Sequence, residues 1–227
     1  MEYEKNVGVQ LTELSESLAL PAKGLGHPKR LEMLEMLAQG ECAVEALARK
    51  VGLGVTTASA HLQTLRRCGL VVRRRQGVHI HYRLAGDDVA ALIVLVRRVA
   101  RAHLAGVDLA SRAALGLDAP YPTVEPVGRT TLLKRLRAGE VVVLDVRPQG
   151  EFKSAHIPGA ISIPLAELVD RLEELPLDRE IVAYCRGEFC VMAHEATRLL
   201  RASGRRAAAL GEGMLEWRAA GRAVART

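Results

Sequence analysis

The second half of the chain is organised around one stretch, Tyr184-Cys185-Arg186-Gly187-Glu188-Phe189-Cys190. The residues before it, Ile-Val-Ala-Tyr at 181–184, predict a short buried strand, and residues 191–200 predict an amphipathic helix. A cysteine between a strand and a helix faces backbone N–H groups and the positive end of the helix dipole, which both favour a thiolate. We therefore predict that Cys185 is a nucleophilic thiol.

The segments around this stretch predict a small α/β domain with a parallel sheet. Residues 141–146 form a continuous apolar, β-branched run, which is typical of a parallel strand buried on both faces. The other expected elements are strands at 161–163, 181–184 and 206–210, and helices at 132–136, 165–172, 191–203 and around Leu215 and Trp217. In such sheets, sites form beyond the carboxyl ends of the strands, where Cys185 stands.

This half of the chain resembles the rhodanese, or sulfurtransferase, domain. The residues that carry the resemblance are Leu144-Asp145-Val146-Arg147-Pro148, Glu151-Phe152, His156-Ile157-Pro158-Gly159-Ala160, Tyr184-Cys185, Gly211-Glu212-Gly213 and Glu216-Trp217-Arg218. The resemblance implies that Cys185 takes a sulfane sulfur from thiosulfate or a persulfide, becomes a cysteine persulfide, and yields the sulfur to a thiol or cyanide. It also implies a substrate-binding loop made by Arg186, Gly187, Glu188, Phe189 and Cys190.

The loop itself refines this expectation. Related phosphatases and arsenate reductases carry a longer loop for a tetrahedral oxyanion, whereas Cys185 to Cys190 is six residues, the sulfurtransferase length. Glu188 adds negative charge, which disfavours thiosulfate and favours a neutral or larger persulfide donor. Two roles stay open for Cys190: it resolves a Cys185 persulfide by forming a disulfide, or it is a small residue at the helix start.

Polar residues near the loop are interpreted mainly as structural. Asp145 and Arg147 are expected to form an ion pair that orders the sheet end, and His156 is expected to be structural as well. Two roles stay open for Arg186, which either adds positive charge beside an anionic donor or is simply solvated.

The first half of the chain predicts a helix-turn-helix. Helices are expected around Leu11–Leu18, from Pro28 to Gly40, around Val44–Ala48, and from Thr56 or Thr57 to Cys68. On the last of these, Leu62 and Leu65 would face inward. The residues expected to contact DNA from this helix are Thr57, Ser59, Ala60, His61, Gln63 and Thr64.

A basic hairpin is expected next. Strand-like runs at 70–74 and 78–84 are joined by Arg75-Gln76-Gly77. Such a hairpin after a recognition helix is a wing, and Arg73, Arg74 and Arg75 suit phosphate or minor-groove contact. The alternative is a helical bundle with a solvated basic hairpin.

The first half resembles the winged helix-turn-helix repressors of the ArsR type. The resemblance rests on residues 27–31 (His-Pro-Lys-Arg-Leu), 58–71 and 77–84. It implies a homodimer on a palindromic operator in double-stranded DNA, released when an inducer binds or modifies the protein. A helix over 87–104 carries an apolar stripe that fits a dimer contact.

The inducer of this half stays open. Cys42 matches the first cysteine of the persulfide-sensing branch, but the helix over 87–104 lacks the second one, and Cys68 is the only other candidate here. Structural and sensing roles therefore stay open for Cys42, while Cys68 fits a small buried residue at a helix end. We expect no metal site, because one thiol and the distant His103 cannot make a closed soft-metal site, and no cofactor.

Composition is consistent with a DNA-binding protein. Lys and Arg number 32 against 26 Asp and Glu, for a net charge of +6. Between Arg66 and Arg83 there are six arginines and no acidic residue. Such a run can be a solvated basic face, and only its place after the helix-turn-helix makes nucleic acid the favoured partner. Without a recognisable leader or a spanning apolar segment, we expect a cytoplasmic protein with no membrane partner and with its cysteines reduced.

These observations predict an α+β winged helix-turn-helix domain over residues 1–104, a linker over 105–122, and an α/β rhodanese-like domain with a central parallel sheet over 123–227. We expect a homodimeric repressor in which a Cys185 persulfide couples reactive sulfur to gene control. The domain either turns over as a sulfurtransferase or loads sulfur once as a sensor. A metal- or oxidant-sensing repressor fused to a separate sulfurtransferase is the alternative.

Overall fold

The computed structural model describes residues 2–115 and 126–227, with side chains from residue 10 onward except that of residue 114. The chain divides into two compact units, the first formed by Met1–Leu37 with Glu41–Val89 and the second by Ala38–Gly40 with Ala90–Thr227. Helix α5 (Asp87–His103) begins in the first unit and continues into the second. No helix in the described ranges is both long and apolar enough to cross a membrane.

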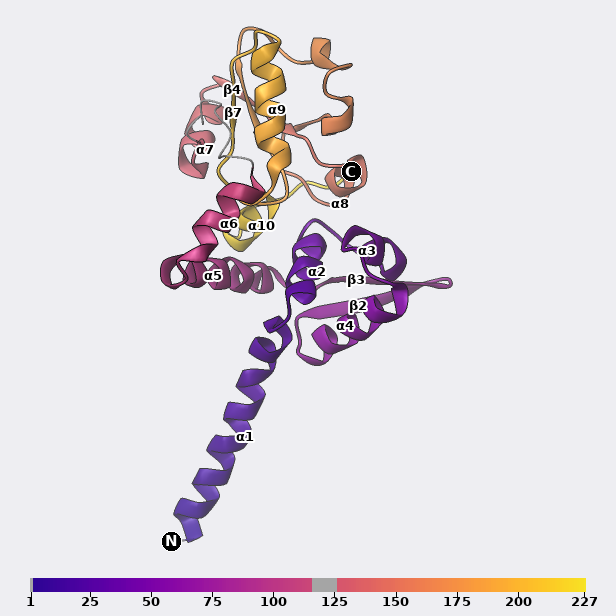
Figure 1. The fold of residues 1–227 in the computed structure, drawn as a ribbon, viewed down its shortest axis with the longest axis vertical. Helices are drawn as coiled ribbons and strands as arrows, with labels where there is room; N and C mark the ends of the chain where they lie inside the picture. Colours follow the sequence, from indigo (N-terminus) through magenta and orange to yellow (C-terminus); the bar gives the residue numbers. More distant parts are fainter. Residues whose placement is uncertain (1, 116–125) are drawn as a thin grey trace. The chain divides into compact units, whose positions relative to one another are not determined.

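The first unit has the helix-turn-helix order that the sequence predicts (Figure 1). Its elements are α1 (Glu2–Leu25), α2 (Pro28–Ala38), β1 (Cys42–Ala43), α3 (Val44–Lys50), α4 (Val55–Arg67), β2 (Val71–Gln76) and β3 (His79–Leu84). Helices α3 and α4 turn Leu47, Leu62 and Leu65 into the core, where all three are fully buried. Gly69 follows α4 with φ of +73°, a left-handed conformation that glycine adopts at little steric cost.

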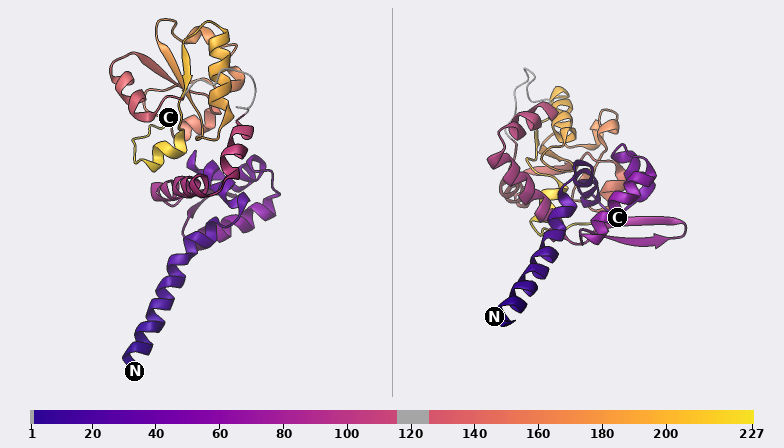
Figure 2. Two further views of the ribbon diagram at one scale, coloured as in Figure 1. Left: turned by 60° about the vertical axis from the view of Figure 1, so that its left-hand side comes forward. Right: turned by 60° about the horizontal axis from the view of Figure 1, so that its bottom comes forward.

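Strands β2 and β3 form the predicted wing, an antiparallel hairpin that projects from the first unit (Figure 2). The hairpin turns at Gly77, where φ is +61°. The sequence did not predict β1, which pairs with β3 and completes a three-stranded sheet in the order β1-β3-β2. Cys42 therefore lies on an edge strand, with Tyr82 as its partner in the register.

The second unit contains a parallel four-stranded sheet in the order β5-β4-β6-β7. Its elements after α5 are α6 (Gly106–Ala114), α7 (Arg129–Arg137), β4 (Val141–Asp145), α8 (Gln149–Ser154), β5 (Ile161–Ser162), the 3₁₀ turns η1 (Leu165–Glu167) and η2 (Leu172–Glu174), β6 (Glu180–Tyr184), α9 (Val191–Ala202), β7 (Ala207–Ala209) and α10 (Met214–Ala219). The central strands β4 and β6 are almost wholly buried, as their continuous apolar runs predict.

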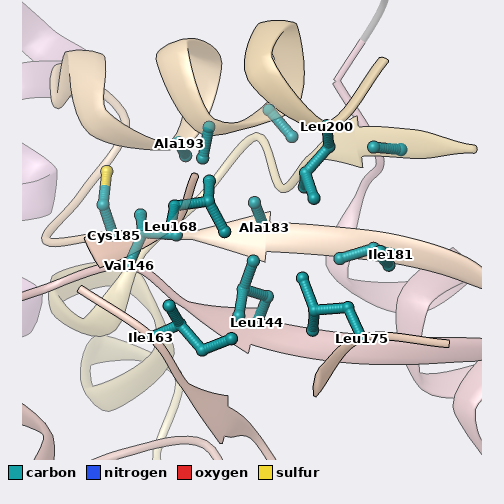
Figure 3. Packing of buried hydrophobic residues seen from close by; sticks show 13 residues of the cluster. Leu144, Val146, Ile163, Leu168, Leu175, Ile181, Ala183, Cys185, Ala193 and Leu200 are labelled. Carbon is teal, nitrogen blue, oxygen red and sulfur yellow. The ribbon is translucent and has the colours of Figure 1, made fainter. Parts of the chain in front are cut away.

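Alternate residues of the two central strands face two separate apolar layers. Leu144, Ile181 and Ala183 share one layer with Ala193 and Leu200 of α9 (Figure 3). The opposite layer joins residues of the same strands to α7, α10 and the segment after α8: Val141, Val143, Val182, Tyr184, Leu132, Met214, Trp217 and Ile157. Because packing holds the sheet from both sides, the end of β6 is a rigid support for the residue that follows it.

Some elements differ from the sequence-based prediction. The helix expected over 165–172 is wrong: the chain forms two 3₁₀ turns, and Arg171 adopts φ of −120° and ψ of 20°, outside the helical region. The fourth helix begins at Val55 with Gly54 as its N-cap, so Thr56 and Thr57 do not cap it.

Two further helices were not predicted. Helix α8 covers Glu151 and Phe152. Helix α6 lies within the segment 105–122 that the sequence predicts as a linker. This helix is strongly amphipathic. Residues 116–122 at the end of that segment, with the prolines at 120 and 122, lie outside the described residues.

Candidate functional site

Cys185 lies directly after β6, at the carboxyl edge of the parallel sheet. It is 2% exposed, so the strand end buries the sulfur almost completely. Its thiol lies 3.2 Å from the backbone oxygen of Cys190 and 3.9 Å from that of Gly187. Cys190 is the N-cap of α9, and its N–H donates to the Gly187 oxygen at 3.0 Å. The loop between the two cysteines therefore curls around the Cys185 sulfur.

Gly213, just before α10, supports this loop from behind. A Cβ atom at this position would lie 2.3 Å from the nitrogen of Gly187 and 2.5 Å from the oxygen of Cys185. The N–H of Met214 donates to the same Cys185 oxygen at 3.1 Å. Only glycine fits here, which gives a physical reason for the Gly-Glu-Gly sequence at 211–213.

The two thiols of the loop interact, and each one shifts the pKa of the other. Burial raises the pKa of Cys185 well above its usual range, and the neighbouring Cys190 raises it further. A hydrogen bond with Cys185 lowers the pKa of Cys190 to about 6, with help from the backbone of Arg186 and Met192. Cys190 is less buried than Cys185, so its position favours the shared negative charge on Cys190, and the nucleophilic role of Cys185 stays a prediction.

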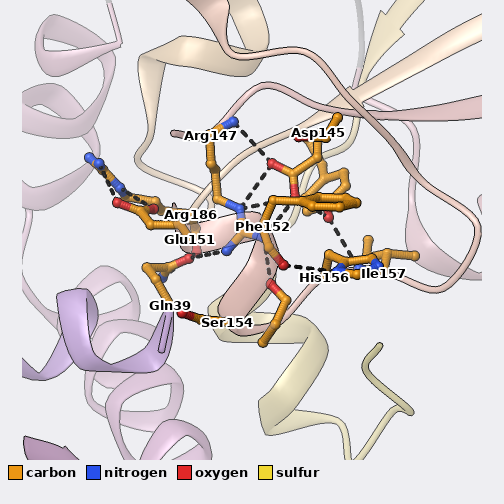
Figure 4. A network of polar contacts seen from close by, with 12 residues as sticks. Gln39, Asp145, Arg147, Glu151, Phe152, Ser154, His156, Ile157 and Arg186 are labelled. Carbon is orange, nitrogen blue, oxygen red and sulfur yellow. Dashed lines mark hydrogen bonds and ion pairs between the residues drawn. The ribbon is translucent and has the colours of Figure 1, made fainter. Parts of the chain in front are cut away.

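A buried ion pair orders the sheet edge beside the loop, as predicted (Figure 4). The Arg147 guanidinium lies 2.6 Å from Asp145, and both side chains are fully buried. Arg147 also donates to the backbone oxygen of Ala155 at 2.7 Å. The hydroxyl of Tyr184 donates to Asp145, so the residue before the catalytic candidate is held by the same network.

Arg186 and His156 both have partners within the second unit. Arg186 makes a bidentate ion pair with Glu151 of α8, at 2.8 and 2.9 Å, so its charge is offset rather than directed at a donor. The His156 ring stacks on Phe152 with centroids 3.7 Å apart, and its Nδ1 lies 2.8 Å from the Phe152 oxygen. Both arrangements are structural.

Two arginines of α5, both in the second unit, contact the outer part of the loop. Arg101 lies 2.9 Å from Glu188, which accounts for the acidic residue that looked misplaced in the sequence. The Arg97 guanidinium lies 4.8 Å from the centre of the Phe189 ring and 3.0 Å from Glu216. Burial raises the pKa of Glu216, although the Gly213 N–H and Arg97 oppose that shift.

A cavity of about 420 Å³ opens over the two thiols. Besides the loop, it is lined by Arg101, by Asp108 and Arg112 of α6, and by His194 of α9. Sequence reasoning missed these residues. Arg101, Asp108 and Arg112 come from elements that no motif connects to Cys185, and His194 lies on the helix predicted after the loop but was not identified as a site residue. The sequence-based prediction took residues 105–122 as a linker without clear periodicity, and the amphipathic spacing of residues 106–114 is the signal that could have indicated α6.

The candidate DNA interface is on α4 in the first unit. Of the predicted contact residues, Thr57, Ala60 and Gln63 are exposed. Ser59 and Thr64 are half-buried, and so is His61, whose ring lies 4.5 Å from that of His27. Burial and His27 lower the pKa of His61, so the ring packs as a neutral group rather than standing free at the helix surface.

The arginines of the wing are exposed but not equivalent. Arg73 and Arg75 lie on one face of β2, and strand alternation places Arg74 on the other. Arg74 forms an ion pair with Glu41, which raises the pKa of Arg74 and lowers that of Glu41. Arg73 and Arg75 are thus the better placed residues for phosphate contact.

Comparisons with known proteins agree with both halves of this description. The model of the bacterial regulatory protein, arsR family, matches residues 27–72, and that of the rhodanese-like domain matches residues 129–220. The HTH-type transcriptional regulator Rv0324 of Mycobacterium tuberculosis is 51% identical over 208 residues, which are 92% of this chain and 90% of that protein. The chain belongs to the ArsR family. It is a DNA-binding transcriptional regulator with a C-terminal rhodanese-like domain.

The ArsR-family regulator also resembles shorter proteins. The biofilm growth-associated repressor of Agrobacterium fabrum is 43% identical over 76 residues, which are 34% of this chain and 65% of that protein. A solution structure of the homodimeric winged helix-turn-helix DNA-binding domain of Mb0332 from Mycobacterium bovis is 49% identical, covers 41% of this chain and 86% of that one, and has a TM-score of 0.39.

The other two cysteines of this ArsR-family chain lie in the first unit. Cys42 is half-buried on β1. Cys68 is the C-cap of α4 and is buried against α1, where a Cβ on Gly24 would lie 3.0 Å from its Cβ. The position of Cys68 fits a packing role.

Proposed function

We propose that this ArsR-family regulator is a homodimeric repressor whose rhodanese-like domain senses reactive sulfur by forming a persulfide at Cys185. One observation carries the proposal: the loop that would receive the sulfur is in direct contact with α5. Glu188 pairs with Arg101 at 2.9 Å, and Phe189 lies under Arg97. Helix α5 starts in the unit that holds α4, so this one continuous helix connects the loop contacts to the DNA-binding unit.

The thiol pair can load the sulfur without an external base. The Cys185 thiol passes its proton to the Cys190 thiolate, and the new Cys185 thiolate attacks the outer sulfur of a persulfide donor. The departing thiolate of the donor then takes that proton from Cys190 and leaves as RSH. The backbone groups around Cys185 and the rigid end of β6 hold the nucleophile in place during both steps.

Added sulfur has to occupy space beside the contacts of α5. The cavity over Cys185 is lined by Glu188, Phe189 and Arg101, so a persulfide there alters the surroundings of the ion pair and of the arginine–aromatic contact. Such exposed ion pairs contribute little to stability, which lets a small chemical change shift their geometry. Sulfur loading would thereby shift the position of α5 against the loop.

The apolar faces of two helices support the homodimer. Leu95 and Val99 of α5 are 43% and 51% exposed, and Leu11, Leu14 and Leu18 of α1 are exposed as well. Faces of this kind are covered when two copies pair. A two-fold dimer would set its recognition helices about 34 Å apart on a palindromic operator.

Sulfur uptake tests the proposal. We expect mass spectrometry to find one added sulfur on Cys185 of the Cys190→Ser variant after treatment with an organic persulfide, and no uptake at this position in Cys185→Ser. An assay with excess organic persulfide as donor and cyanide as acceptor, run beside one with thiosulfate as donor, then separates an enzyme, which turns over many times, from a sensor, which is modified once per chain. Unmodified Cys185 under conditions that modify small thiols would disprove the proposal.

A further inference from the structure

The loop holds a second thiol in a place where the first thiol can reach it. The Cys185 sulfur lies 3.2 Å from the Cys190 backbone oxygen, and the turn closed by the Cys190 N–H and the Gly187 oxygen brings position 190 back over position 185. Both cysteines line the same cavity of about 420 Å³. Two nucleophilic side chains therefore share one opening and one hydrogen-bonded loop.

The second thiol is also the charged one. The hydrogen bond with Cys185, the backbone of Arg186 and Met192, and the positive charge of Arg186 together lower the pKa of Cys190 to about 6. Its position as N-cap of the twelve-residue helix α9 adds the favourable end of the helix dipole. At neutral pH a thiolate thus stands beside the sulfur atom that would carry the persulfide.

We infer that Cys190 is the resolving thiol of a dithiol site that reduces organic persulfides to hydrosulfide. The inference rests on the proposed loading of Cys185 and extends it, because the loaded sulfur does not stay on the protein. The alternative role of Cys190, a small residue that fills the start of α9, requires no interaction between the two side chains.

The reaction balances in two steps. In the first, the Cys185 thiolate bonds to the outer sulfur of R–S–SH, the S–S bond of the donor breaks, and RSH leaves with the proton held by Cys190. In the second, the Cys190 thiolate attacks the Cys185 sulfur, the bond to the outer sulfur breaks, and HS⁻ leaves. The sulfane sulfur is reduced, and the two cysteines are oxidised to a disulfide. A dithiol reductant of the thioredoxin class then restores both thiols.

The charges of the site favour an organic persulfide over thiosulfate. Arg186 is offset by Glu151 and Arg101 by Glu188, so these two cations near the loop are already paired. The Cys190 thiolate adds a negative charge that would repel a dianion. Pockets for small organic molecules measure about 300–1,000 Å³, and the cavity of about 420 Å³ is within that range.

The experiment treats the full chain with one equivalent of cysteine persulfide, without reductant, and follows hydrosulfide release and protein mass. A background with Cys42→Ala and Cys68→Ala leaves only the two loop thiols. In this background we expect one equivalent of hydrosulfide and a disulfide between Cys185 and Cys190. In Cys190→Ser and Cys190→Ala, we expect a lasting persulfide on Cys185 and hydrosulfide release no faster than in the protein-free control. A folded Cys185→Ser should show neither product.

The outcomes separate the two proposals. A persulfide that persists on Cys185 while Cys190 is intact overturns the resolving role and leaves the sensing proposal standing. Equal hydrosulfide release with and without Cys190 does the same. If no sulfur reaches Cys185 in any variant, both proposals fail.

Discussion

The backbone of Gly213 packs directly against the backbone of the Cys185 loop, and this close approach is possible because glycine has no side chain. We expect Gly213→Ala to destabilise the protein by about 1–3 kcal/mol and to slow sulfur uptake at Cys185, because the added carbon would collide with Gly187 and Cys185. Chemical denaturation and the uptake assay measure the two effects. Gly150→Ala in α8 is the matched control, since no atom of the described residues lies within 4 Å of the added carbon there. Equal behaviour of the two variants would refute the packing argument.

The buried Asp145–Arg147 ion pair is a second feature whose effect on stability depends on single residues. We expect Asp145→Asn to lower the free energy of unfolding by about 3–5 kcal/mol, because it leaves a fully buried guanidinium without its counter-charge. Urea unfolding gives the value. Arg171→Gln, which removes ion pairs with the exposed side chains of Glu167 and Glu174, should change stability little. A small effect of Asp145→Asn would mean that the pair does not order the sheet edge.

The lowered pKa of Cys190 predicts its reactivity. The thiolate is the reactive form, so alkylation of Cys190 should accelerate as the pH rises through about 6. Removing the hydrogen bond in Cys185→Ala should raise the pKa of Cys190 and move the midpoint to higher pH. Rates of iodoacetamide labelling, read by peptide mass spectrometry, test both statements. A midpoint that Cys185→Ala leaves in place would show that the two thiols do not interact.

At the scale of the element, the wing is where the structure changes an expectation. We expect Arg73→Ala and Arg75→Ala each to lower the slope of log affinity against log salt by about one, whereas Arg74→Ala has a smaller effect because Glu41 already offsets its charge. Titrations of operator DNA at several salt concentrations measure the slopes. Slopes that stay unchanged in all three variants would mean that the hairpin is not a DNA-binding wing.

Strands buried on both faces were predictable from sequence, whereas very short strands and 3₁₀ turns were not. Strands β4 and β6 show continuous apolar runs because all but one residue of each strand is buried. The apolar residues at 165, 168 and 172 fit an α-helix equally well, yet local backbone geometry at Arg171 divides the segment into two 3₁₀ turns. Two-residue strands such as β1 carry too little pattern to detect.

The position of Cys185 was predictable for a similar reason, but its electrostatics were not. A strand end followed by a helix start is a local pattern, and the Asp145–Arg147 pair spans only two residues. In contrast, Glu188 pairs with Arg101, which is 87 residues away in the sequence, and Gly213 packs against the loop from a later segment of the chain. The charge order of the thiols depends on their relative burial, which spacing alone does not reveal.

At the scale of the whole molecule, the central claim is that sulfur on Cys185 changes operator binding. The most direct test measures operator affinity of the full chain before and after persulfide treatment, with the state of all four cysteines followed by mass spectrometry in the same samples. We predict that affinity falls as Cys185 is modified, that Cys185→Ser keeps full affinity after treatment, and that Arg97→Ala with Arg101→Ala allows sulfur uptake but uncouples it from DNA release. An operator affinity that stays constant while Cys185 is fully modified would contradict the account.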